Sequence, residues 1–126
     1  MKRHAMGVWG EDQALEKLKS LGYHFRERNW RVTAGEIDLI LEDHGEVVFV
    51  EVKTRSSRHF GRPEDSLTPR KKARILQAAL AYLDAHNLWA RSWRVDVVAI
   101  ECTLHGEVKR MDHYINVDME PGELPV

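Results

Sequence analysis

One stretch, residues 35–53, constrains the fold more than any other part of the chain. It contains two apolar runs separated by His44-Gly45, a dipeptide typical of a tight turn, and therefore predicts a β-hairpin. A turn closing symmetrically there pairs Leu41 with Val48 and Leu39 with Val50. Apolar residues occupy both faces of this hairpin near its turn, so we expect its strands to be buried on both sides.

Charged residues gather at the open end of the same hairpin. The pairing places Asp38 opposite Glu51 and Glu36 opposite Lys53. Like charges directly opposed across two strands are destabilising, so a cation is expected between the two carboxylates. The ammonium of Lys53 and a divalent metal ion are both candidates, because hard cations prefer carboxylate oxygens. The alternative is that these charges form the solvated face of an amphipathic hairpin.

The segment before the hairpin supplies a third carboxylate. Apolar residues at helical spacing predict a helix over residues 8–21, ended by Gly22. Glu11 lies four residues before Leu15 and seven before Leu18, which puts it on the face that must be buried. The alternative is a first-turn glutamate that is favoured by the helix dipole and has its carboxylate in solvent.

The remaining segments complete an α/β pattern. A strand is expected over residues 23–32, a loop over 54–67, a helix from Thr68 to about His86, and strands over 93–100 and 108–117. This order, αβββαββ, predicts a mixed sheet flanked by helices, because the second helix allows a crossover to a parallel strand. We expect one domain over residues 1–118 and a C-terminal tail over 119–126.

Composition narrows the class of protein. The 126 residues suit one domain, and the single cysteine, Cys102, allows no intramolecular disulfide, which suits a reducing compartment. No apolar run approaches the roughly 18 residues that a membrane span needs. A cytoplasmic protein without membrane contact is therefore expected.

The formal net charge of −1 conceals a basic segment. Residues 53–74 contain eight lysines and arginines but only two acidic residues. Several of these cations lie at the start of the second helix, where they oppose the helix dipole unless an anion such as phosphate docks there. A solvated run of charges is the alternative. The candidate phosphate-contacting residues beyond Lys53 are Arg55, Arg58, Arg62, Arg70, Lys71, Lys72 and Arg74.

These residues resemble a known pattern. Asp38, twelve intervening residues and then Glu51-Val52-Lys53 are similar to the signature of the PD-(D/E)XK nuclease superfamily, with Ile37 at the position of the proline. Glu11 resembles the extra acidic residue of the Holliday-junction-resolvase branch. The sequences of residues 35–40 and 49–55 resemble the bacterial YraN-like family of uncharacterised proteins, and this resemblance extends over about residues 10–117.

The resemblance implies a restriction-endonuclease-like core, Mg²⁺ or Mn²⁺ as cofactor, and nucleic acid as partner. DNA is the expected form, with junction, flap, duplex and single-stranded DNA, or RNA, as open alternatives. It further implies that Asp38 and Glu51 are metal ligands, that Glu11 binds metal-bound water or a second ion, and that Lys53 lies beside the attacking water or the reacting phosphate. Two second-rank candidates are Glu36 and Gln77.

Rival functions remain open at this point. A nuclease fold also serves non-catalytic nucleic-acid-binding proteins, since fold does not fix function. Exposed tryptophans such as Trp89 and Trp93 would suit a protein-interaction module. A two-fold homodimer would suit a nuclease that cuts two strands.

Overall fold

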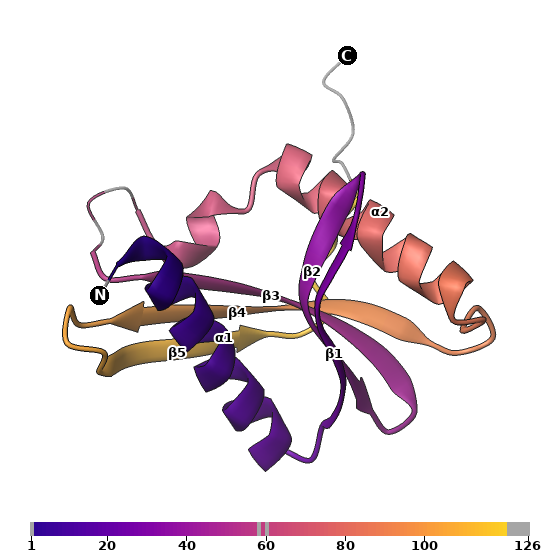
Figure 1. Ribbon diagram of the computed structural model, residues 1–126, viewed down its shortest axis with the longest axis horizontal. Helices are drawn as coiled ribbons and strands as arrows, with labels where there is room; N and C mark the ends of the chain where they lie inside the picture. The colour runs from indigo at the N-terminus through magenta and orange to yellow at the C-terminus, as the bar shows by residue number, and fades with distance from the viewer. Residues whose placement is uncertain (1, 58, 60, 121–126) are drawn as a thin grey trace.

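Two helices and one mixed sheet form the part of the chain described by the computed structural model, residues 2–57, 59 and 61–120 (Figure 1). Arg58 and tail residues 121–126 lie outside these described residues. No helix among them is long and apolar enough to cross a bilayer. The expected order is found, with one short 3₁₀-helix added: α1 (Arg3–Ser20), β1 (His24–Val32), β2 (Gly35–Asp43), β3 (Glu46–Arg55), η1 (Pro63–Ser66), α2 (Pro69–Ala85), β4 (Trp93–Cys102) and β5 (Val108–Tyr114).

The five strands follow one another across the sheet in chain order. Strands β3 and β4 are parallel because α2 carries the chain back between them, and every other neighbouring pair is antiparallel. The β2–β3 register confirms the predicted Leu39–Val50 and Leu41–Val48 pairs. His44 and Gly45 have φ values of 51° and 81°, which is the backbone conformation that a two-residue hairpin turn requires.

Each face of the sheet is covered by one helix, so the hairpin is buried on both sides as predicted (Figure 1). Ala14 and Leu18 of α1 pack with Leu39 and Val50 on one face. The other face packs on α2 through a second apolar cluster that includes Ile40, Phe49, Ile75, Tyr82 and Leu83. Ala78 and Ala79 are also buried on this side of α2. Met119, the first residue of the expected tail, is buried in the same cluster.

Both helix boundaries follow from local chemistry. Helix α1 begins at Arg3 rather than Val8. Residues 3–7 lack the apolar stripe on which the prediction was based, but they contain no proline that would end a helix. It ends where Gly22 adopts a φ of 95°, and the amides of Gly22 and Tyr23 donate to the carbonyls of Lys19 and Leu18. Helix α2 begins as predicted, since the Thr68 hydroxyl accepts the Lys71 amide at 3.2 Å.

Two other boundaries differ from the expectation. Residues 54–67 are not all loop, because Thr54 and Arg55 continue the ladder of β3 with β4 and residues 63–66 form η1. Strand β5 ends at Tyr114, three residues before the predicted end. Asn116 then takes a φ of 56°, which interrupts an extended strand.

Candidate functional site

The site lies at a fork in the sheet. The β2–β3 ladder ends at the Leu39–Val50 pair. Beyond it β2 stays paired with β1 as far as Gly35, whereas β3 stays paired with β4 as far as Arg55. The predicted ladder pairs of Asp38 with Glu51 and of Glu36 with Lys53 are therefore not among the pairs that form, because the two strands diverge at this point.

Two glycines bring the helices close to this fork. A Cβ built on Gly35 of β2 would lie 2.1 Å from the backbone oxygen of Arg74, so only glycine allows β2 to lie this close to α2. A Cβ built on Gly10 of α1 would lie 2.0 Å from the Thr54 hydroxyl oxygen of β3. The divergent strands are thus each held against a different helix.

Asp38 occupies the space that the missing ladder leaves. Its Oδ2 accepts the backbone amide of Val52 at 2.8 Å. A carboxylate oxygen thereby takes the hydrogen bond that a backbone carbonyl would accept in an uninterrupted sheet. This bond fixes Asp38 beside β3, next to the side chain of Glu51.

The protonation of the two carboxyl groups is coupled. Burial, followed by the neighbouring charge of Glu51, raises the pKa of Asp38 from 3.8 to about 8, although the Val52 amide opposes this shift. Burial also raises the pKa of Glu51, against the effect of Lys53. Lys53 Nζ lies 2.8 Å from Glu51 Oε1. Without a bound cation the site thus disfavours two ionised carboxylates, and Lys53 supplies one positive charge beside Glu51.

A cavity of about 790 Å³ opens from these residues toward α1. Glu11 lines it together with Asp38 and Glu51, so the third predicted carboxylate does reach the fork. Its Oε1 lies 3.2 Å from Arg28 Nε of β1, and its side chain is 16% exposed. Glu11 therefore lies on the face of α1 that packs toward the hairpin, rather than in solvent, and Arg28 balances its charge.

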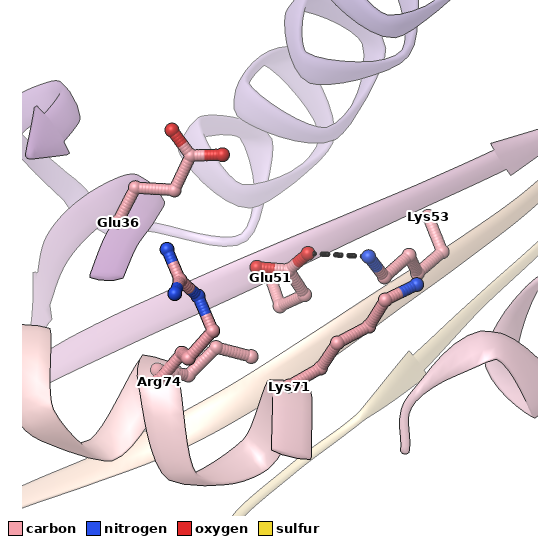
Figure 2. A pocket seen from close by; sticks show the side chains of 6 residues that line it. Glu36, Glu51, Lys53, Lys71 and Arg74 are labelled. Atoms are coloured by element: carbon pink, nitrogen blue, oxygen red, sulfur yellow. Dashed lines mark ion pairs between the residues drawn. The ribbon is translucent and has the colours of Figure 1, made fainter. Parts of the chain in front are cut away.

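A second cavity, of about 200 Å³, opens from the same fork toward α2. Figure 2 shows Lys71 reaching from α2 toward Lys53, with Arg74 on the same wall near Glu51. The cation of Lys53, then burial and the cation of Arg55, lower the pKa of Lys71. Positive charges therefore converge here closely enough to repel one another, which an anion would relieve.

The other predicted residues divide into three groups by the cavity that they line. Glu36 lines both cavities and forms an ion pair with Arg31 at 3.1 Å, while Arg55 lines the larger cavity. Arg62 and Lys72 line a different cavity, which is bounded by Tyr114 of β5. Two exposed residues of α2 line neither cavity at the fork, and these are Arg70 and Gln77.

Two residues of the site were missed by the sequence analysis. Arg3 lines the larger cavity from the first turn of α1, which was expected to lie outside the helix. Arg28 neutralises Glu11 and also binds Asp12 at 2.6 Å. The partner of Glu11 had no local signal, since Arg28 is seventeen positions away and meets it only through the packing of α1 on β1.

The carboxylates at the fork are the candidate ligands for a metal ion. Among the described residues no group of three or more histidine, cysteine or acidic side chains is arranged to hold a metal ion. Asp38 and Glu51 provide two carboxylates at the fork. Mg²⁺ is usually bound by one or two carboxylates together with waters and substrate phosphates, so this pair fits that mode of binding.

The fold and site define a mixed α/β protein with one buried carboxylate, one half-buried carboxylate and a lysine where two strands diverge. The model of the uncharacterised protein family UPF0102 matches residues 10–100, and the chain belongs to this family. This confirms the YraN-like resemblance at the level of the family. The chain is 42% identical to a UPF0102 protein of Roseiflexus castenholzii over 113 residues, or 89% of this chain and 91% of that one. A UPF0102 protein of Syntrophomonas wolfei is 40% identical over 88% of this chain and 95% of its own length.

Proposed function

We propose that this protein is a metal-dependent nuclease that hydrolyses phosphodiester bonds of nucleic acid, with DNA as the expected substrate. The observation that carries the proposal is the meeting of Asp38, Glu51 and Lys53 at the fork, between two cavities that each contain further cations. The spacing of these three residues is that of the PD-(D/E)XK superfamily, and we assign the fold to a restriction-endonuclease-like core on the same ground.

Asp38 and Glu51 would hold Mg²⁺ or Mn²⁺, with Glu11 placed to bind a metal-bound water. A cation bound there supplies Lewis-acid activation of the phosphate and of water. The raised pKa of Asp38 means that a proton competes with the metal. Metal affinity should therefore increase as pH rises toward about 8, the pKa of Asp38.

Lys53 supplies a positive charge without a metal. Its ammonium group forms an ion pair with Glu51 at 2.8 Å and lines both cavities. This position allows it to stabilise negative charge that develops on a phosphate oxygen. Lys71 and Arg74 on one side, and Arg3 and Arg55 on the other, would contact neighbouring phosphates. Such contacts give affinity without reading base sequence.

The direct test measures binding and cleavage separately. Junction, flap, duplex and single-stranded DNA, and one RNA, are incubated with the protein in Ca²⁺ for gel shift and in Mg²⁺ or Mn²⁺ for cleavage. We expect cleavage of at least one substrate by the wild type and none by Lys53→Met or Asp38→Asn, with binding largely retained. Binding of every substrate without cleavage in any metal would overturn the catalytic proposal.

A non-catalytic nucleic-acid-binding protein is the second candidate. The crowding of Lys53, Lys71 and Arg55 favours it, because these cations attract phosphate whether or not a metal binds. It predicts salt-sensitive binding that survives Asp38→Ala. The tryptophan-mediated interaction module has less support: Trp89 is 51% exposed, but Trp93 packs edge-on against Phe49 with ring centroids 6.0 Å apart.

A further inference from the structure

The two edges of the sheet differ in how they are protected. Strand β1 carries a register shift between Phe25 and Glu27 and a left-handed residue, Asn29 with φ 55°. Irregularities of this kind make an edge strand unsuitable for pairing with another strand. Strand β5, at the opposite edge, keeps a continuous register with β4 from Tyr114 to Arg110 and shifts only toward its start.

The β5 edge is also the more apolar one. In the described part of the chain no strand pairs with the outer side of β5. Four of the eight exposed large hydrophobic residues lie in or beside it, namely Leu104, Val108, Tyr114 and Ile115, with exposures of 68, 43, 37 and 60%. A regular edge strand flanked by exposed apolar side chains is suited to bind another strand.

The sequence of β5 complements itself when two copies run antiparallel. Along an edge strand, only every second residue directs its backbone N–H and C=O outward. Two copies can therefore pair only if odd-numbered residues face odd-numbered ones and even-numbered residues face even-numbered ones. Within the regular part of β5, residues 110–114, centring the pair on Met111 places the two Met111 residues opposite each other and Arg110 opposite Asp112. Shifting the centre by one residue in either direction places arginine opposite arginine or aspartate opposite aspartate, and both arrangements are destabilising.

We propose that β5 is a homodimer interface at which a second copy of this chain adds its own β5 in antiparallel orientation, centred on Met111. The two sheets then form one continuous ten-stranded sheet, and the two-fold axis passes beside Met111. Arg110 and Asp112 of both copies face the side on which Arg110 binds Glu64 of η1. Met111 of both copies faces the opposite side, where it packs on the α1 layer. This inference is independent of the proposed nuclease activity.

Disulfide cross-linking tests the interface and its register together. The background is the full chain with Cys102→Ala, since Cys102 is the only cysteine. Met111→Cys places two thiols directly opposite each other, at a Cα separation of about 5 Å, within the range of a disulfide. Lys109→Cys, the matched control on the same face, separates the two Cα atoms by about 13 Å along the strand. Asp112→Cys places the two Cα atoms about 8 Å apart, beyond the range of an unstrained disulfide.

Mild oxidation should therefore convert Met111→Cys to a covalent dimer and leave Lys109→Cys and Asp112→Cys monomeric on a denaturing gel. Cross-linking at residue 112 but not 111 would overturn the register. Equal cross-linking at all three positions would show random collision and would overturn the interface, as would the absence of cross-linking at all three.

Light scattering after size exclusion supplies the second measurement. The wild type should give twice the chain mass of 14.6 kDa, and the apparent mass should fall on dilution. Residue 112 faces Arg110 of the second copy in the proposed dimer. Asp112→Arg should therefore raise the dissociation constant of the dimer by at least tenfold. Glu16→Arg on the exposed surface of α1 makes the same change in charge and should leave the mass unchanged. A monomeric wild type at high concentration would overturn the proposal.

Discussion

Asp38 is the residue on which the architecture and the chemistry of the site depend together. It accepts the Val52 amide at the point where the ladder between β2 and β3 ends, so it stabilises the fork. It also lies half-buried beside Glu51, so its ionised form is costly without a cation. The same side chain therefore supports the fold best when protonated and would bind a metal only when ionised.

Replacing Asp38 with asparagine separates these two roles. The folded protein binds the Asp38 proton more tightly than the unfolded chain does, so stability should fall as pH rises from about 4 to about 8. Asp38→Asn retains an acceptor for Val52 but removes this dependence. In EDTA it should match the wild type near pH 4 and melt higher at pH 8, by about 4 °C for each 1 kcal/mol of difference.

Magnesium should reverse that order at pH 8. The wild type should gain about 1.4 kcal/mol at a free metal concentration ten times Kd, whereas the variant lacks one ligand and should gain little. Melting curves of both proteins with EDTA and with Mg²⁺ measure this. Glu36→Gln, a charge removal at an exposed carboxylate of the same cavity, is the control. Four coincident midpoints would contradict a metal site at Asp38.

At the scale of single elements, features that depend on residues close together in the chain could be predicted from the sequence. The His44-Gly45 turn determines the hairpin register, and Thr68 followed by Pro69 determines where α2 begins. Features that depend on contacts between residues far apart in the chain could not be predicted. The end of the β2–β3 ladder depends on the close packing of Gly35 on Arg74, which no strand periodicity reveals.

The basic residues of α2 show the same limit within the site. Lys71 and Lys72 are indistinguishable by composition, yet one lines the fork and the other a cavity beside β5. Adjacent helical residues point about 100° apart, so the direction of each depends on how α2 packs. Periodicity identified the apolar face of α2 but not which cation lies toward Glu51.

Two glycines of α1 provide a test of its docking. Gly7 has no atom within 4 Å of an added Cβ, so Gly7→Ala should stabilise the protein by up to about 1 kcal/mol through helix propensity. Gly10→Ala should instead destabilise it by about 1–3 kcal/mol, because the methyl group would overlap Thr54. Urea denaturation measures both changes. Adding Thr54→Ala to Gly10→Ala should recover part of the loss, and a neutral Gly10→Ala would contradict the packing.

The direction of each α2 lysine can be tested through the salt dependence of binding. If Lys71 contacts a phosphate, Lys71→Glu should weaken DNA binding for every sequence and reduce the slope of log K against log salt by about 1. Lys72→Glu is the matched control, because Lys72 lines the separate cavity. Fluorescence anisotropy titrations from low to moderate salt measure the slopes. Equal effects of the two changes would indicate nonspecific attraction rather than a phosphate contact at the fork.

At the scale of the whole molecule, acidic side chains with shifted pKa values act in opposite directions on stability. The pKa of Glu64 is lowered to about 2, chiefly by its hydrogen bond from Arg110. Burial acts to raise the pKa of Asp96, but hydrogen bonds from His113 and Arg94 outweigh it and lower this pKa overall. These two groups stabilise the fold once they ionise, whereas Asp38 destabilises it when it ionises.

The thermal stability of the metal-free protein should therefore pass through a maximum. Below about pH 4 the contributions of Glu64 and Asp96 are lost as pH falls through their lowered pKa values. Above about pH 4 stability falls toward pH 8, because the unfolded chain releases the Asp38 proton while the folded protein retains it. Calorimetry in EDTA should place the highest Tm between about pH 4 and 6. Asp38→Asn should flatten only the basic side and Glu64→Gln only the acidic side. A Tm that rises steadily from pH 5 to 8 would contradict this balance.

The hydrogen bond between the Val52 amide and Asp38 also gives the molecule an internal spectroscopic reporter. An amide proton that donates to a carboxyl oxygen changes its magnetic environment when that carboxyl group ionises. The Val52 cross-peak in a ¹H–¹⁵N spectrum should move with a midpoint near pH 8, the pKa of Asp38. Adding Mg²⁺ should move the same peak at lower pH. One nuclear spin pair in the middle of the sheet would then report proton and metal occupancy without an added chemical probe.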